Sequence, residues 1–595
     1  MSCNARVHCL YFCACLIEPF SEIIIHSVSI MKARLLVALL IVFVLIAGYM
    51  ILQRQRVEQA QLLIINGTVY TLNDAEPLAE AIAVRDGKIV GIGTTGDLRK
   101  RFASARILDV QGKAVYPGFT DAHAHVEGLG AALVNIDLMD TKSVEEIQRL
   151  VAQRAAVLPP GSWIRGRSWD QNKWASKAFP THQMLDAVTR DHPVVLTRVD
   201  GHAVWVNKVA LELAAITKAT ADPEGGKILR DARGEPTGVL VDNAANLVEA
   251  VMPAPTETEM REAIEKATRE CVRVGLTAVH DMGVELDVLA IYKQLVQERK
   301  LPLRIYAALA GAGPAWAQYV RQGPDIGQYN GRLTVRALKL YADGALGSRG
   351  AALIEPYADD PLNRGLTLTG ADSLRKLAEA ALSAGFQLCV HAIGDRANHI
   401  VLNVYEELSK ANPDRFKNAR FRIEHAQVLE PADIARFSKL GIIPSMQPTH
   451  CTSDMPWAED RLGPERVKGA YAWRSLLETG SIIAGGSDFP VESPNPLFGF
   501  YAAITRQDHE GKPEGGWHPE QRMQRVEALK AFTLWAAYAA FEEQQRGSLE
   551  VGKLADIVVL SNDIMKCEPR DILKTTVEFT ILGGDIVYAD TPPPL

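Results

Sequence analysis

Between residues 118 and 545, short apolar runs alternate with helical stretches, and this alternation restricts the fold more than any other feature of the sequence. Each run has the length of a buried strand, and stretches such as Glu257–Gly275 and Ser373–Gly385 separate several of them. The runs are Val194–Thr197, Leu276–Val279, Leu303–Tyr306, Val335–Leu340, Gln387–Val390, Arg420–Ile423, Gly441–Pro444 and Ile482–Gly485. Repeated βα units predict an α/β fold, a (β/α)8 barrel with insertions, whose functional side chains lie at the carboxyl ends of the strands.

Both ends of the chain have a different, β-rich pattern. Near the N-terminus, Leu62–Gly67 and Ala81–Val84 are strand-like, and Asp86-Gly87 is a typical hairpin turn. Similar segments return only at Gly547–Leu560 and Val577–Tyr588. Because neither group is large enough to close a sheet alone, we expect the two to pair into one small composite β-sandwich.

These patterns divide the chain into a leader and three structural parts. We expect a leader over residues 1–60, the β-sandwich from 61–117 and 546–595, and the barrel from 118–545. An insertion at about 151–252 interrupts the barrel and contains a hairpin-like segment at Gly225–Gly234. This insertion is expected to roof a pocket.

The leader contains an apolar segment, Leu35–Leu52, with basic residues on both sides. A bilayer is crossed by about 20 such residues, whereas the apolar region of a secretory signal has about 7 to 15. A buried core helix is the third alternative, but the run has no polar face. We expect an uncleaved membrane anchor with the folded part outside the cytoplasm, although flanking charges on both sides leave the orientation open.

The overall composition argues against nucleic acid as a partner. The chain has a net charge of -7, 47% hydrophobic residues and no block rich in lysine and arginine. Proteins that neutralise nucleic-acid phosphates need such blocks. Nucleic acid is therefore not an expected partner, and a homodimer is the ordinary expectation for a soluble domain of this kind.

Two histidines one residue apart, His123 and His125, follow an apolar run and the Pro117-Gly118 break. One turn would present both imidazoles to the same point, as in a metal-ligand pair. Taken alone, such a pair is more often incidental. The evidence that favours a metal comes from the later strand ends.

Four further residues of metal-binding or proton-transfer type lie at or just after apolar runs. They are Lys339, His391, His425 and Asp488. Singly, each has an ordinary alternative: a solvated lysine, a hydrogen-bonded core histidine or a helix N-cap. Together with the histidine pair they indicate a polar site where a barrel presents its strand ends.

Several local motifs then carry a resemblance to a known family. They are Pro117–His125, Trp169–Trp174, Asp200–Asn207, Lys339–Arg349, His391–Arg396, Arg422–Gln427, Ser487–Asp488 and Gly552–Val559. In combination these motifs resemble the amidohydrolase superfamily of metal-dependent hydrolase barrels, and within it the branch of YtcJ-like hydrolases and N-substituted formamide deformylases. The resemblance covers residues 62 to 590.

The resemblance implies a metal centre. His123 and His125 would bind one divalent metal with Asp488 close to it, and His391 and His425 would bind a second. Lys339, carboxylated by carbon dioxide, would bridge the two; if it stays unmodified, a one-metal site remains an alternative. Zinc suits the imidazole-rich ligands best, with manganese or iron as alternatives.

The resemblance also implies an activity. The expected reaction is hydrolysis of a non-peptide C–N bond in a small-molecule amide, with N-substituted formamides as leading candidates. A metal-activated hydroxide would attack, and Asp488 would pass its proton to the leaving amine. The alternatives are a hydrolase of cyclic amides of the imidazolone or hydantoin type and a non-catalytic scaffold with the same fold.

Further residues are candidates for contact with the substrate. His202 would donate to the substrate or its oxyanion as a catalytic group, with a structural loop histidine as the alternative. Substrate-binding roles are expected for Trp169, Asp170, His280 and Asp343. For the aromatic residues, ordinary core packing is the competing interpretation.

Overall fold

The computed structural model describes residues 31–48, 58–102, 106–253 and 255–591. Its centre is a parallel sheet whose strands follow one another around a nearly closed barrel. In spatial order the strands are β8 (Phe119–Ala124), β15 (Leu276–Val284), β16 (Arg304–Ala310), β18 (Leu333–Tyr341), β19 (Gln387–Ala392), β20 (Arg422–His425), β21 (Ile443–Met446) and β22 (Ala484–Gly485). The last strand returns beside the first, where the Asp488 N–H donates to the His123 carbonyl over 2.8 Å. The predicted (β/α)8 barrel is confirmed.

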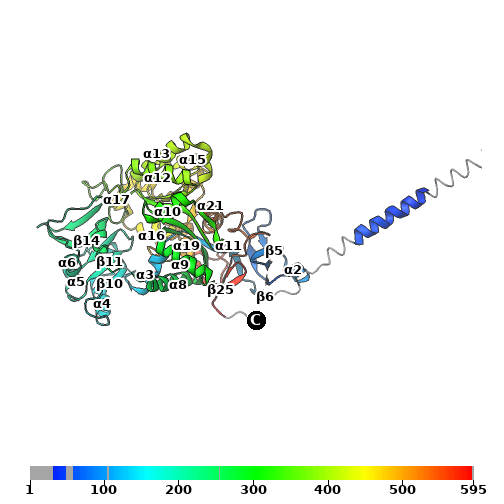
Figure 1. Ribbon diagram of the computed structural model, residues 1–595, viewed down its shortest axis with the longest axis horizontal. Coiled ribbons are helices and arrows are strands. Elements are labelled where there is room, and N and C mark those ends of the chain that lie inside the picture. Colours follow the sequence, from blue (N-terminus) through cyan, green and yellow to red (C-terminus); the bar gives the residue numbers. More distant parts are fainter. Residues whose placement is uncertain (1–30, 49–57, 103–105, 254, 592–595) are drawn as a thin grey trace, which may run out of the picture.

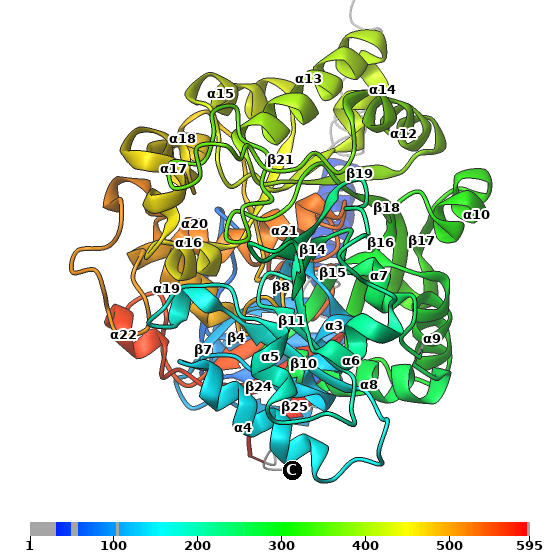
Figure 2. The same ribbon diagram turned by 90° about the vertical axis from the view of Figure 1, so that its left-hand side faces the viewer.

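Helices surround this barrel and cover its outer face (Figure 2). They include α8 (Glu257–Arg273), α9 (Leu286–Gln297), α10 (Pro314–Gln322), α12 (Ala371–Ala384), α13 (Asp395–Ala411) and α15 (Pro431–Leu440). Helix α8 begins at a capping box in which Thr256 and Glu259 each bond the other's backbone N–H. Helix α12 ends at Gly385 with φ 81°, a left-handed conformation that favours glycine.

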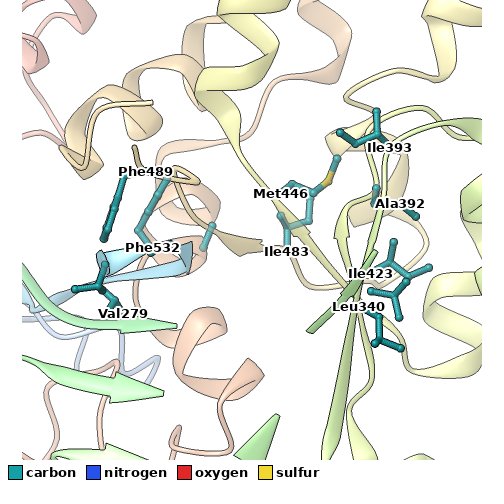
Figure 3. Close-up of a cluster of buried hydrophobic side chains, with 14 of the residues drawn as sticks. Val279, Leu340, Ala392, Ile393, Ile423, Met446, Ile483, Phe489 and Phe532 are labelled. Atoms are coloured by element: carbon teal, nitrogen blue, oxygen red, sulfur yellow. The ribbon is translucent and has the colours of Figure 1, made fainter. Parts of the chain in front are cut away.

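A large hydrophobic cluster fills the space between the strands and the helices. Figure 3 shows part of it, with Leu340 on β18, Ile423 on β20 and Met446 on β21. Ile423 is fully buried, and burying such a side chain stabilises the fold by about 1.5–3 kcal/mol. This packing holds the strand ends in fixed positions.

The two ends of the chain form a composite β unit. One sheet contains β2 (Thr68–Tyr70), β3 (Leu78–Ala79) and β7 (Ala114–Pro117) together with β23 (Ile557–Leu560), β24 (Val577–Leu582) and β25 (Asp585–Ala589). The other sheet contains β1 (Leu62–Ile65), β4 (Ala81–Arg85), β5 (Lys88–Gly93) and β6 (Arg106–Asp109). Strands β7 and β23 pair antiparallel, with Val115 opposite Val559. The expectation that the chain ends share one β unit is therefore confirmed.

A fourth sheet roofs the barrel. It contains β9 (Ile136–Asp137), β10 (Ile164–Trp169), β11 (Val194–Arg198), β12 (Ala203–Val206), β13 (Gly226–Arg230) and β14 (Pro236–Asp242). Figure 1 shows this roof and the composite β unit at opposite ends of the barrel. The run Val194–Thr197 is thus a strand, but it belongs to the roof and not to the barrel. A buried strand has the same local pattern in either sheet, so this run was counted with the barrel strands although it lies inside the insertion predicted at about 151–252.

Near the N-terminus, Met31–Gly48 forms one helix, and none of it is buried against the rest of the molecule (Figure 1). Its length and composition suffice to cross a membrane. A signal sequence near an N-terminus has the same properties. The end of the predicted apolar segment, residues 49–52, and the leader before residue 31 lie outside the described residues.

Candidate functional site

The carboxyl ends of five barrel strands bring the predicted metal-binding residues together. His123 lies on β8 and His125 directly follows it, while Asp488 follows β22. The remaining three are Lys339 on β18, His391 on β19 and His425 on β20. All except His123 border a cavity of about 730 Å³ between the barrel and the roof. His123 is fully buried behind it, with Nε2 3.0 Å from the Lys339 Nζ.

Three atoms that can accept hydrogen bonds lie close together: the Nε2 atoms of His123 and His125 and a carboxylate oxygen of Asp488. The His125 Nδ1 donates to the Met282 carbonyl over 2.8 Å, so its Nε2 carries the lone pair. The His123 Nδ1 likewise faces a Glu424 carboxylate oxygen at 2.6 Å. Both Nε2 atoms point at the Asp488 Oδ1, at distances of 3.4 and 3.1 Å. Such a set of lone pairs is stable around a divalent cation, so these residues fit a metal.

A second group shares Asp488. The His425 Nδ1 bonds the Gln447 Oε1 over 2.8 Å, because the Gln447 Nε2 donates to the Ser445 carbonyl. This arrangement leaves the His425 Nε2 with its lone pair. His450, on α16 (Pro448–Asp454), lies with its Nε2 3.7 Å from the Asp488 Oδ2. Together His425, His450 and Asp488 form another potential metal-binding group.

His391 lies beside this group without belonging to it. Its ring centre is 4.6 Å from that of His425, but its Nε2 faces the Gly344 carbonyl at 3.4 Å and an Asp343 oxygen at 3.5 Å. The family resemblance implied that His391 and His425 bind one metal together. In the structure, His450 is nearer to the shared carboxylate.

A buried charge network holds His123 from below. Glu424 accepts from the His123 Nδ1, and its carboxylate lies 2.7 Å from the Arg422 Nε. Although burial opposes ionisation, Arg422 holds the pKa of Glu424 well below its ordinary value. Arg422 also donates to the Nδ1 of His280 over 2.9 Å. A carboxylate behind a metal-binding histidine fixes the ring and its tautomer.

Burial lowers the pKa values of four metal-site residues, His123, His391, His425 and Lys339. It lowers the pKa of His123 to about 4 and holds the pKa values of His391 and His425 well below the ordinary value. Burial also lowers the pKa of the Lys339 amine. Neutral imidazoles and a neutral amine are the forms that bind cations or react with carbon dioxide.

His202 approaches from the roof and borders the cavity. Its Nδ1 bonds the Asp242 Oδ1 over 2.6 Å, and its ring centre lies 5.2 Å from that of His391. Although burial opposes protonation, the Asp242 hydrogen bond raises the pKa of His202. The structure therefore places His202 opposite the strand ends, as a donor held by a carboxylate.

The four predicted substrate-binding residues have different surroundings. Asp170 borders the cavity and pairs with Arg198 at 2.7 Å. Trp169 is fully buried in the roof beside Trp174 and Trp205, and donates to the Leu196 carbonyl.

The other two are also buried away from the cavity lining. His280 lies beneath the site against Arg422. Asp343 accepts the backbone N–H groups of Ala352, Ile393 and Gly394 and so organises a loop. Of the four, Asp170 alone lines the cavity that the structure describes.

Sequence reasoning missed several residues of the site. His450 follows β21, so the strand-end argument extended past Gly441–Pro444 would have found it. Glu424 stands inside the motif Arg422–Gln427 without having been assigned a role. Asp242 and Arg167 line the cavity from the roof, and no local signal distinguishes them from surface charges.

Comparisons with known proteins agree with this geometry. The model of the Amidohydrolase family matches residues 106–588. The putative amidohydrolase YtcJ of Bacillus subtilis (strain 168) is 34% identical over 532 residues, which are 88% of this chain and 98% of that protein. N-substituted formamide deformylase of Arthrobacter pascens is 28% identical over 551 residues, 90% of this chain and 99% of the relative.

A solved structure also matches along most of the chain. The crystal structure of an uncharacterized metal-dependent hydrolase from Pyrococcus horikoshii OT3 superposes with a TM-score of 0.69 and 28% identity, covering 85% of this chain and 99% of the other. The family match spans the barrel and all its polar strand ends. The chain is therefore a hydrolase of the amidohydrolase family, in the YtcJ-like branch.

Proposed function

We propose that this protein hydrolyses a non-peptide C–N bond in a small amide, with N-substituted formamides as the leading substrate class. The observation that carries the proposal is the acceptor cluster of His123, His125 and Asp488 at a cavity of about 730 Å³. A cavity of this size suits a small molecule. Similarity to the N-substituted formamide deformylase of Arthrobacter pascens supports the formamide class.

The same cluster would hold the metal. His123, His125 and Asp488 would bind one divalent cation, and His425, with His450 or His391, would bind a second. Zinc fits this imidazole-rich set best. A bound cation would lower the pKa of a water molecule and polarise the amide carbonyl.

Lys339 would bridge the two groups in a carboxylated form. Its buried Nζ lies 3.0 Å from the His123 Nε2, where an ammonium ion would oppose a cation. The neutral amine adds carbon dioxide and releases a proton, and the resulting carbamate offers two oxygen ligands. This assignment follows the family resemblance as well as the position of the amine.

The protein side chains would move the protons. As water adds to the amide carbon, the Asp488 carboxylate accepts its proton and then gives it to the leaving nitrogen, so that the C–N bond breaks with a neutral amine leaving. His202, held by Asp242, would donate to the substrate oxygen from the roof.

We further propose that the helix Met31–Gly48 anchors the protein in a membrane, with the barrel outside the cytoplasm. The length and apolar character of the helix and its lack of burial support an anchor. The body of the protein has its own buried core, so it does not depend on this helix for packing.

The reaction is tested with the full-length, detergent-purified protein loaded with zinc. Release of benzylamine is measured from N-benzylformamide and N-benzylacetamide, and ring opening to N-carbamoylglycine is measured from hydantoin. We expect turnover of N-benzylformamide, and a loss of about 10²- to 10⁴-fold in Asp488→Asn. Asp585→Asn, an exposed change in the composite β unit, is the matched control and should keep wild-type activity. Absence of turnover of every amide by the zinc-loaded wild type, or full activity in Asp488→Asn, would refute the proposal.

A further inference from the structure

Arg167, on β10 of the roof, is a cationic side chain of the cavity lining without an acidic partner. The lining cations are Arg167, Lys173, Arg198 and Lys339. Lys173 pairs with Asp140 at 2.8 Å, and Arg198 pairs with both Asp170 and Asp200. Arg167 makes no ion pair with any residue that the structure describes, and its buried Nε has no hydrogen-bond partner among them.

The strand fixes the position of this guanidinium. β10 lies between β9 and β11, and Arg167 stands opposite Asp137 and Thr197 in these two strands. Just after it, Ser168 adopts φ 80° at a shift in strand register, and Trp169 is then buried in the roof. A side chain presented by a paired strand is held more firmly than one on a loop.

The guanidinium lies against the turn that carries His202. A Cβ atom added to Gly201 would meet a terminal nitrogen of Arg167 at 3.4 Å. Gly201 has φ 76°, so both its backbone conformation and this neighbour favour glycine. Arg167 therefore lies beside His202, on the roof side of the cavity.

A largely buried guanidinium without an ion pair lowers the stability of the fold unless an anion binds to it. Burial lowers the pKa of Arg167, and the carboxylates of Asp488 and Asp200 oppose this shift. Among the residues that the structure describes, the lining acids without an ion-pair partner are Glu127, Glu249, Asp281, Asp454 and Glu492. None of them lies within 4.0 Å of the Arg167 guanidinium, so they make no ion pair with it.

We propose that Arg167 binds a carboxylate of the substrate, so that the hydrolysed amide belongs to an N-acyl or N-formyl amino acid. A planar guanidinium matches a carboxylate through two parallel hydrogen bonds, and each is stronger than a neutral one. The inference rests on the proposed hydrolysis and specifies its substrate class. Arg167 is thus a specificity-determining residue of the roof.

The test compares N-formylphenylalanine with N-formyl-2-phenylethylamine, which differ only in the carboxylate. The zinc-loaded wild type should prefer the acid through a lower KM. In Arg167→Gln, the ratio of kcat/KM for the acid to that for the neutral amide should fall about 10- to 100-fold. Arg167→Lys should retain part of the preference, because it keeps the charge and loses the paired geometry.

Arg165→Gln is the matched control. Arg165 lies two residues earlier on β10, outside the cavity lining, and donates to the Pro253 carbonyl over 2.7 Å. Its substitution should leave the ratio unchanged. An unchanged ratio in Arg167→Gln, or a wild-type preference for the neutral amide, would overturn the inference. Equal losses of kcat for both substrates in Arg167→Gln would overturn it too, because they would indicate stabilisation of the oxyanion.

Binding separates this inference from the proposed reaction. Calorimetry of the zinc-loaded proteins with 3-phenylpropanoate and 3-phenylpropanol involves no amide bond. We expect the wild type and Arg165→Gln to bind the acid more tightly, and Arg167→Gln to lose that difference. This result without any amide hydrolysis would refute the reaction and support the anion site. Amide hydrolysis, together with equal binding of the acid by the wild type and by Arg167→Gln, would support the reaction and refute the anion site.

Discussion

Replacing Glu424 by glutamine tests the network beneath the metal-binding residues. Glu424 is fully buried, accepts from the His123 Nδ1 at 2.6 Å and lies 2.7 Å from the Arg422 Nε. Glutamine keeps the shape of the side chain and removes its charge. Two separate consequences follow, one for stability and one for metal binding.

The first consequence is an uncompensated charge in the core. Arg422 is fully buried, and its hydrogen bonds to the Ala122 carbonyl and to the Ser445 hydroxyl go to neutral groups. Removing one partner of a buried ion pair costs about 3–5 kcal/mol. Glu424→Gln should therefore lower the free energy of unfolding by about that amount.

The second consequence concerns His123. A neutral amide holds the imidazole less firmly than a carboxylate and no longer ensures that Nδ1 carries the proton. Loss of such a partner weakens metal binding by about 10- to 100-fold. Zinc affinity should fall by this factor even where the variant is fully folded.

Urea denaturation of the metal-free proteins measures the first effect, and zinc competition against a chelator measures the second. Glu543→Gln is the control, because Glu543 pairs with Arg420 at 2.8 Å while both side chains are about one fifth exposed (19% and 20%). That change should cost about 1 kcal/mol or less and leave zinc affinity unchanged. Wild-type stability together with wild-type zinc affinity in Glu424→Gln would refute the reasoning.

Three other expectations follow from the structure. Asp556→Asn should cost about 3–5 kcal/mol at pH 7, because the buried carboxylate lies 2.6 and 2.9 Å from Arg304 and joins the composite β unit to the barrel. Burial raises the pKa of Asp556, but Arg304 outweighs burial and holds this pKa below its ordinary value. The stabilisation by the Asp556–Arg304 pair is therefore fully present above about pH 4 and shrinks as the pH falls further. Measuring the free energy of unfolding at pH 7 and at pH 3 checks the sign of this pH dependence. In ¹³C-bicarbonate the wild type should show a carbamate ¹³C NMR signal. Lys339→Met should lose this signal and also part of its bound metal. A signal that persists in Lys339→Met would place the carbamate on another residue. Deleting residues 1–57 should move the protein from the membrane to the soluble fraction on centrifugation and keep hydrolysis, because the removed helix is not buried; a truncated protein that still sediments with membranes would contradict the anchor.

Much of the barrel could be predicted because its signals are local. A buried parallel strand is a short apolar run, and the residue after it projects toward the active face, so the positions of Lys339, His391 and His425 were readable from the sequence. The pairing of the chain ends was readable as well, because neither half could complete a sheet. Val194–Thr197 was counted among the βα runs although it lies within the predicted insertion, and the structure places it in the roof; strand order is not a local property.

Side-chain surroundings were harder to predict. Trp169 is part of a buried aromatic cluster in the roof, and His280, which follows the apolar run Leu276–Val279, packs against Arg422 beneath the site. An apolar or polar residue at a strand end can face either the cavity or the core. Which one it faces depends on the register of neighbouring strands.

The sequence by itself determined which residue types stand at the strand ends, and with them the family and its hydrolytic chemistry. Only the tertiary structure decided that His450 shares Asp488 with His425 and that Glu424 supports His123. It also decided that Arg167 faces the cavity without an acidic partner. These relations join residues far apart in the chain, so they exist only once barrel closure and the packing of the roof set the distances between them.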